Sequence, residues 1–283
     1  MKQIFPYKQI IQILSLDVAI GALISGMAVA RVAACAMPMI WYVALPLAVW
    51  VVYTSDHLLD AWRLKDKAST ARHQFHAQYF KPISIVWGIA LVTCLTWVMW
   101  AANPALRWLG LGIGVLVLIH LGLVMIAGAR RSWLIVKEGG VALIYTSGVW
   151  GGAWVMCFEN FALPLYGLAG MFFLLALLNL LIFSIYEAET DLRDGHTSWV
   201  LGVGTKRARR IAGVIAGGAA GLGFTLLLND SFEIKMLALI QLAMLGVLVC
   251  LLLLPKTFGR HALYRLLGDG AFLLPLLYLV EVV

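Results

Sequence analysis

The chain has 283 residues, of which 63% are hydrophobic and only 12% are charged. In a soluble domain, about a quarter of the residues are typically charged and about half are apolar. This composition therefore excludes a soluble globular protein. The 27 glycines follow no regular period and only 4 residues are cysteines, which excludes collagen-like and disulfide-stapled classes. The composition predicts an all-α polytopic membrane protein that forms a single transmembrane domain over residues 1–283.

Apolar runs of the length of a membrane-spanning helix recur along the whole chain. Such a helix needs about 20 mostly apolar residues. The runs are continuous rather than alternating with a period of two, which favours helices over the strands of a β-barrel. We predict nine spans, at residues 10–30, 37–56, 82–102, 105–128, 138–157, 163–186, 209–228, 235–254 and 267–283.

The longest connections, at 57–81 and 187–208, follow the second and the sixth spans. The first four spans and the next four are therefore compatible with two versions of one four-helix unit. This matters because the interface between such repeats is where transporters typically bind their substrates.

The basic residues are distributed very unevenly between the loops. If the N-terminus is inside, all but three of the 21 Lys and Arg residues lie on the inner side, and the exceptions are Arg31, Arg107 and Lys235. The positive-inside rule requires such an asymmetry. The net charge of +7 then follows from topology and the anionic inner leaflet, without a nucleic-acid partner. We predict a protein of a prokaryotic cytoplasmic membrane whose N-terminus and acidic loops are cytoplasmic and whose C-terminus is outside.

The four cysteines lie in or beside apolar runs. Cys35, Cys94, Cys157 and Cys250 form no CxxC pair and have no His at the spacing of a metal site. We interpret them as small buried residues.

Two of the inner loops begin with clusters of carboxylates. Asp56 and Asp60 are four residues apart, while Glu187, Asp191 and Asp194 lie at i, i+4 and i+7, so each set shares one helical face. Like charges at this spacing destabilise a helix by a few tenths of a kcal/mol, which suggests a shared cation. Because the ligands are all oxygens, they favour Mg²⁺. The alternative is a solvated helix end whose acids pair with neighbouring Arg and Lys side chains.

Several other polar residues are candidates for substrate contacts. Arg72 and His73, in the first long inner loop, and Lys137, at the start of the fifth span, could bind a phosphate group. For each of them the alternative is that membrane topology alone explains the positive charge.

Four polar residues inside or at the ends of the predicted spans could line a cavity. Ionisable residues within spans mark functional sites by default, and this applies to Asp17. Asn179 lies two helical turns before Glu187 and on the same face. Tyr53 and Tyr145 could stabilise a cation with their rings and hydroxyl groups. The alternatives are hydration at the inner interface for Asp17, a bond between helices for Asn179, and packing for the tyrosines.

The arrangement resembles the UbiA superfamily of intramembrane prenyltransferases over nearly the whole chain. That family has nine helices, an N-terminus inside, and two Asp-rich motifs in the loops after helices two and six. The first family motif is N-x-x-x-D-x-x-x-D. Here Asp56 and Asp60 match its two Asp positions, whereas Val52 occupies the position of the Asn.

The second family motif is close to D-x-x-x-D-x-x-x-G-x-x-T. Glu187, Asp191 and Gly195 match its first three fixed positions, with Glu in place of the first Asp, and Thr197 stands one position early. The stretch 201–208 that follows is similar to the sequence that follows this motif in the family.

The resemblance implies a specific activity. In the family each motif holds Mg²⁺, the two motifs together bind a prenyl diphosphate, and an acceptor is alkylated after the diphosphate leaves. The implied metal ligands are Asp56, Asp60, Glu187, Asp191 and Asp194. We therefore expect a Mg²⁺-dependent prenyltransferase that acts on a prenyl diphosphate and a small aromatic or lipophilic acceptor among membrane lipids.

Two alternatives stay open at this stage. A membrane terpene cyclase of the same superfamily would ionise the diphosphate without using an acceptor. A non-enzymatic lipid-binding, transport or assembly protein could keep the same helices without turnover, because the departures at Val52 and Glu187 fall within the metal-binding motifs.

Overall fold

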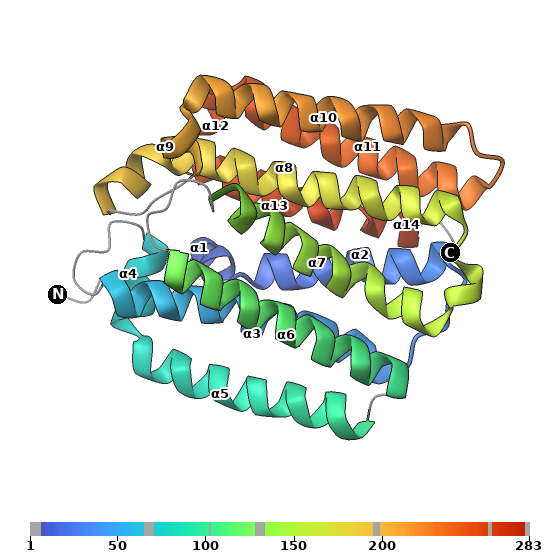
Figure 1. Ribbon diagram of the computed structural model, residues 1–283, viewed down its shortest axis with the longest axis horizontal. Coiled ribbons are helices and arrows are strands. Elements are labelled where there is room, and N and C mark those ends of the chain that lie inside the picture. Colours follow the sequence, from blue (N-terminus) through green and yellow to red (C-terminus); the bar gives the residue numbers. More distant parts are fainter. Residues whose placement is uncertain are drawn as a thin grey trace.

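A computed structural model describes residues 7–64, 71–101, 103–127, 134–194, 199–259 and 262–280. It is 91% helical, and no strand occurs among these residues. The long helices run side by side along one common direction (Figure 1). The all-α fold predicted from the composition is therefore confirmed.

Seven helical segments are long and apolar enough to cross a membrane. They are Met39–Trp62 in α3, Phe80–Trp100 in α5 and the π-helical turn η2, Pro104–Val124 in α6, Leu163–Thr190 in α8, Thr205–Leu227 in α10, Phe232–Leu253 in α11, and Leu263–Val280, which joins α13, η6 and α14. The elements themselves are α3 (Met39–Leu64), α5 (Phe80–Thr96), η2 (Trp97–Ala101), α6 (Pro104–Ala127), α8 (Leu163–Asp194), α10 (Thr205–Leu227), α11 (Phe232–Leu253), α13 (Leu263–Gly270), η6 (Ala271–Leu273) and α14 (Leu276–Val280).

The first and fifth predicted spans are also helices, but they are not among these seven. They are α2 (Leu16–Val32), with 17 residues, and α7 (Leu134–Met156), with 23 residues. Both lie inside the bundle, where α2 packs against α3 and α7, and α7 packs against α6 and α8. Multiple membrane crossings are thus supported by seven helices, and each of the nine predicted segments is mainly helical where the structure describes it.

The short elements gather at the ends of the bundle. At the end shown at the left of Figure 1 lie α1 (Tyr7–Ile13), α4 (Ala71–Gln78), α9 (Trp199–Val203) and α12 (Pro255–Phe258), whereas α14 ends at the right. We call these the α1 end and the α14 end. Gly204, between α9 and α10, has φ of 85°, a backbone conformation that glycine adopts without steric cost.

Helix α8 is the centre of the hydrophobic core. It packs against α7, α10 and α11, and its residues Leu168, Met171, Leu175, Leu178 and Ile182 are completely buried. By contrast, only 6% of the residues in the most apolar 18-residue stretch of Phe80–Trp100 are buried, and none in that of Pro104–Val124. Because α5 and α6 leave large apolar faces exposed, this side of the bundle is suited to contact with lipid.

A disulfide bond joins the connections at the α14 end. Cys35, after α2, is bonded to Cys157, after α7, over a sequence separation of 122 residues. The interpretation of the four cysteines as small buried residues is confirmed for Cys35 and Cys94, but Cys157 is only partly buried and Cys250 is exposed. The sequence analysis did not anticipate the disulfide, and Cys94 and Cys250 are free.

We expect the disulfide to be detectable by counting thiols. In denaturant without a reductant, two thiols per chain should react with a maleimide, and four should react after reduction. The Cys35→Ser variant should expose Cys157 and give three thiols without reduction. Mass spectrometry of the alkylated chain measures each number, and four reactive thiols in the unreduced native sequence would contradict the pairing.

Candidate functional site

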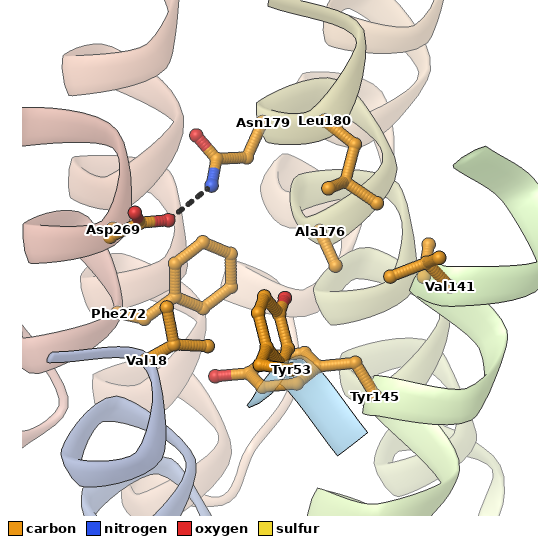
Figure 2. A pocket seen from close by; sticks show the side chains of 10 residues that line it. Val18, Tyr53, Val141, Tyr145, Ala176, Asn179, Leu180, Asp269 and Phe272 are labelled. Atoms are coloured by element: carbon orange, nitrogen blue, oxygen red, sulfur yellow. Dashed lines mark hydrogen bonds between the residues drawn. The ribbon is translucent and has the colours of Figure 1, made fainter. Parts of the chain in front are cut away.

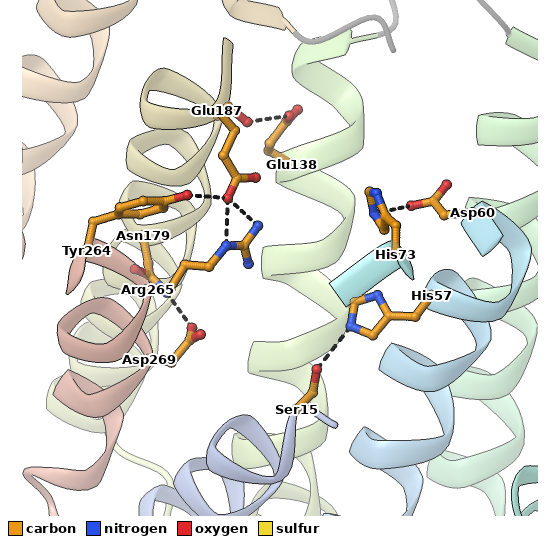
Figure 3. A network of polar contacts seen from close by, with 11 residues as sticks. Ser15, His57, Asp60, His73, Glu138, Asn179, Glu187, Tyr264, Arg265 and Asp269 are labelled. Carbon is orange, nitrogen blue, oxygen red and sulfur yellow. Dashed lines mark hydrogen bonds and ion pairs between the residues drawn. The ribbon is translucent and has the colours of Figure 1, made fainter. Parts of the chain in front are cut away.

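An ion pair links α8 to α13 near the α1 end of the bundle. Glu187 Oε1 accepts hydrogen bonds from Tyr264 Oη at 2.7 Å and from Arg265 Nε at 2.6 Å, and it also contacts the second guanidinium nitrogen of Arg265 (Figure 3). About a fifth of each charged side chain is exposed. The bonds all end on the same oxygen, so Oε2 of Glu187 is left for another partner.

A second polar group forms around the ends of α3 and α4. His73 Nε2 lies 3.6 Å from Asp60 Oδ2, an ion pair when the ring is protonated. His57 Nε2 is bonded at 3.0 Å to Ser15 Oγ, at the junction of α1 and α2, and its ring packs edge-on against His76 (Figure 3). Burial lowers the pKa of His76, so its ring is neutral near neutral pH.

The Arg72 guanidinium connects the two polar groups electrostatically. Burial lowers the pKa of Arg72, and the positive charge of Arg265 lowers it further. The negative charges of Glu187, Asp56 and Asp60 raise it. The carboxylates that follow the second and the sixth predicted spans therefore act on one cation at the α1 end.

The other residues predicted to contact phosphate or metal do not belong to either polar group. Lys137 is exposed near the start of α7, and both Lys137 and Asp56 act electrostatically on His120. The side chains of Asp191 and Asp194 lie outside the described residues, although the backbone of α8 continues through them. Within the described part of the chain, no three His, Cys, Asp or Glu side chains are grouped closely enough to hold a metal by themselves.

A cavity with aromatic walls lies among the helices beside these polar groups. The space in it that is open to the centre of a water-sized sphere is about 20 Å³, which is room for about one water molecule. Its lining includes three of the residues predicted from the sequence, namely Tyr53, Tyr145 and Asn179, together with Asp269 and Phe272 (Figure 2). Asp17 itself does not line the cavity, although its neighbour Val18 does.

A hydrogen bond at the cavity depends on a close approach between α8 and α13. Asn179 Nδ2 donates to Asp269 Oδ1 at 3.2 Å (Figure 2). A Cβ atom at Gly268 would lie 2.4 Å from Asn179 Oδ1 and 2.7 Å from the ring of Phe183. Only glycine therefore permits this approach without displacing Asn179.

Sequence reasoning missed the contribution of α13 to the site. Tyr264, Arg265 and Asp269 all come from this helix, yet the last predicted span began only at residue 267. A signal for Asp269 was present, because an ionisable residue within an apolar span marks a functional site by default. No such signal existed for Arg265, since an inner-side arginine is expected from topology alone.

Comparisons with known proteins add no relationship. No protein-family model, no curated protein and no solved structure matches the chain.

We expect loss of the Arg265 guanidinium to destabilise the fold. The Arg265→Gln variant leaves Glu187 charged and partly buried without its cation, which should cost roughly 1.5–3 kcal/mol, the range of hydrogen bonds to charged groups. Thermal unfolding in detergent measures the loss. Arg210→Gln on α10, which is exposed, is the control and should leave the unfolding temperature unchanged; equal effects of both variants would contradict the role of the pair.

The close approach at Gly268 gives a second stability prediction. Gly268→Ala should destabilise the protein by about 1–3 kcal/mol, the usual cost of an overpacked site. Gly270→Ala is a control in the same helix because a Cβ atom there has no neighbour within 4 Å. It should be neutral or stabilising, since alanine favours helix over glycine. A Gly268→Ala protein as stable as Gly270→Ala would show that α13 does not pack as described.

Proposed function

We propose that the protein is a Mg²⁺-dependent intramembrane prenyltransferase, of the kind found in the UbiA superfamily, that moves a prenyl group from its diphosphate to a small acceptor. The observation that carries the proposal is that Asp60, beside His73, and Glu187, bonded to Arg265, lie at the same end of the bundle (Figure 3). An aromatic cavity beside this point adds the second environment that the reaction needs.

The donor set fits Mg²⁺ when substrate phosphates complete it. The ion typically takes one or two carboxylates, with phosphate oxygens and waters in its remaining positions. Asp56 and Asp60 supply one pair of carboxylates, and Oε2 of Glu187 is not used by Arg265 or Tyr264. When bound, the metal would neutralise the diphosphate and make it a better leaving group.

The chain's own residues supply binding and protection. We propose that Arg72 donates hydrogen bonds to diphosphate oxygens, for which its planar guanidinium is well suited. The Tyr53 and Tyr145 rings at the cavity can stabilise positive charge that develops on the prenyl group. The apolar helices around them exclude water, which would otherwise quench an allylic cation.

The topology that we propose has nine spans, with α2 and α7 counted among them. It places the α1 end and its carboxylates in the cytoplasm and the α14 end outside. The Cys35–Cys157 disulfide at the α14 end supports this orientation, as does the distribution of basic residues.

One observation favours a second candidate, a lipid-binding protein without turnover. The charge of Glu187 is already compensated by Arg265, so this carboxylate needs no metal to be stable. A protein that binds a phosphorylated lipid through Arg72 would keep the same contacts.

Release of diphosphate separates the two candidates. With geranyl, farnesyl or geranylgeranyl diphosphate, the purified protein should release diphosphate only when Mg²⁺ is present. Asp60→Asn should lower the rate by at least roughly 100-fold, because loss of a metal ligand should exceed the 10–100-fold effect of losing a supporting partner. Chelation of the metal should have the same effect.

The control is a carboxylate at the opposite end of the bundle. Asp230 is exposed between α10 and α11, so Asp230→Asn should retain the full rate. If the native protein binds these diphosphates but releases none with Mg²⁺, the lipid-binding candidate replaces the enzyme.

A further inference from the structure

Basic residues are concentrated at the start of α10. Lys206, Arg207, Arg209 and Arg210 lie within its first two turns, and the first turn contains no acidic residue. The N-terminus of a helix carries a positive partial charge, which favours acidic side chains and disfavours basic ones. The positive-inside rule explains on which side of the membrane these cations lie, but it does not explain why they share one helix end.

The spacing of these cations adds repulsion between them. Lys206 and Arg210 are four residues apart, and Arg207 and Arg210 are three apart, so their side chains are neighbours on the helix surface and destabilise it as like charges. Within the described part of the chain, Arg31 and Arg265 each form an ion pair with a carboxylate, whereas none of the cations of α10 does. Their charge is therefore not compensated by the acidic side chains that the structure describes.

Three of the cations face away from the protein. Lys206, Arg207 and Arg210 are exposed, and we call them the α10 basic face. The residues that α10 buries against α8 and α11, such as Ala208 and Ala212, lie on the other side of the helix. Helix α10 also runs along an outer edge of the bundle (Figure 1). The α10 basic face is therefore open to a partner outside the protein.

Exposed apolar side chains begin directly after the α10 basic face. Ile211 is 38% exposed and Val214 is 76% exposed, and α10 is long and apolar enough to cross a membrane. A change from exposed basic to exposed apolar residues is typical of the boundary between lipid headgroups and acyl chains. The charge of the α10 basic face thus lies at the level of the lipid phosphates.

The same side of α10 has no side chains further along the helix. Gly213, Gly217 and Gly221 continue the row that starts with Lys206 and Arg210, because all five positions are three or four residues apart. A Cβ atom at any of these glycines would meet nothing within 4 Å. An acyl chain can therefore lie directly against the helix below the cations.

We propose that the α10 basic face binds the phosphate group of an anionic phospholipid, one acyl chain of which lies along the row of glycines. The lipid phosphate supplies the negative charge that the described carboxylates do not supply. A second copy of the chain fits this side less well, because two copies related by an axis along the membrane normal would bring like-charged basic faces together. The inference uses none of the residues of the proposed active site and does not depend on enzymatic activity.

Two lipids that differ in headgroup charge test the inference. The full-length protein, freed of lipid in detergent, is titrated with dioleoyl phosphatidylglycerol, which is anionic, or with dioleoyl phosphatidylcholine, which has the same acyl chains and no net charge. Native mass spectrometry should show saturable binding of phosphatidylglycerol, at least about tenfold tighter than that of phosphatidylcholine. Lys206→Gln/Arg210→Gln should weaken phosphatidylglycerol binding roughly 25-fold, because each basic residue at an anionic surface contributes about a factor of five.

A matched double variant removes the same charge elsewhere. Lys81, at the start of α5, is exposed, and Lys235, in α11, is partly exposed. Lys81→Gln/Lys235→Gln should keep the native affinity for phosphatidylglycerol. Without added lipid, both double variants should unfold at the temperature of the native protein, which separates a lost site from a damaged fold.

The outcomes that would overturn the inference are distinct from failure of the proposed function. They are no saturable binding of phosphatidylglycerol, equal binding of phosphatidylcholine, equal losses in the two double variants, or displacement of the lipid by inorganic phosphate at the same concentration. Dimers that form through α10 without lipid would likewise replace the lipid by a second copy. A protein that binds lipid as expected but releases no diphosphate would contradict only the enzymatic proposal.

Discussion

The arrangement of the site depends on how charge is held within an apolar bundle. A carboxylate or guanidinium that leaves water loses several kcal/mol of solvation, and only a close partner compensates for it. Glu187 and Arg265 meet this requirement for each other and thereby fix α13 against α8. Because Asp269 lies one helical turn after Arg265 in α13, the same pair also determines where this carboxylate enters the cavity.

The two ends of the bundle differ in how they are held together. At the α1 end, short helices and partly buried ionisable groups meet, and their attraction depends on the protonation of residues such as His73 and Asp60. At the α14 end, a disulfide joins the connections after α2 and α7, and Arg31 donates to the backbone carbonyl of Tyr278. One end of the bundle is thus fixed by a covalent bond, and the other is held by polar contacts between helices.

The departures from the family motifs can be interpreted from these contacts. Glu187 is one methylene longer than the aspartate of the motif, and here it is bonded to Tyr264 and Arg265 while one oxygen is left over. Val52, partly buried in α3, supplies no polar atom where the motif has asparagine. The proposed metal would thus rely more heavily on Asp56, Asp60 and substrate oxygens than the motif implies.

The sequence by itself determined the membrane class, the all-α fold and the helical segments, because these follow from local apolar runs and from the sum of loop charges. It also identified Tyr53, Tyr145 and Asn179, which line the cavity. Only the tertiary structure decided that Arg265 neutralises Glu187, 78 residues earlier, and that Cys35 pairs with Cys157 across 122 residues. Neither pairing has a local signature, since partners so far apart in the chain are brought together by helix packing and not by spacing. The same reason applies to Asp269, whose hydrogen bond with Asn179 depends on how closely Gly268 lets α13 approach α8.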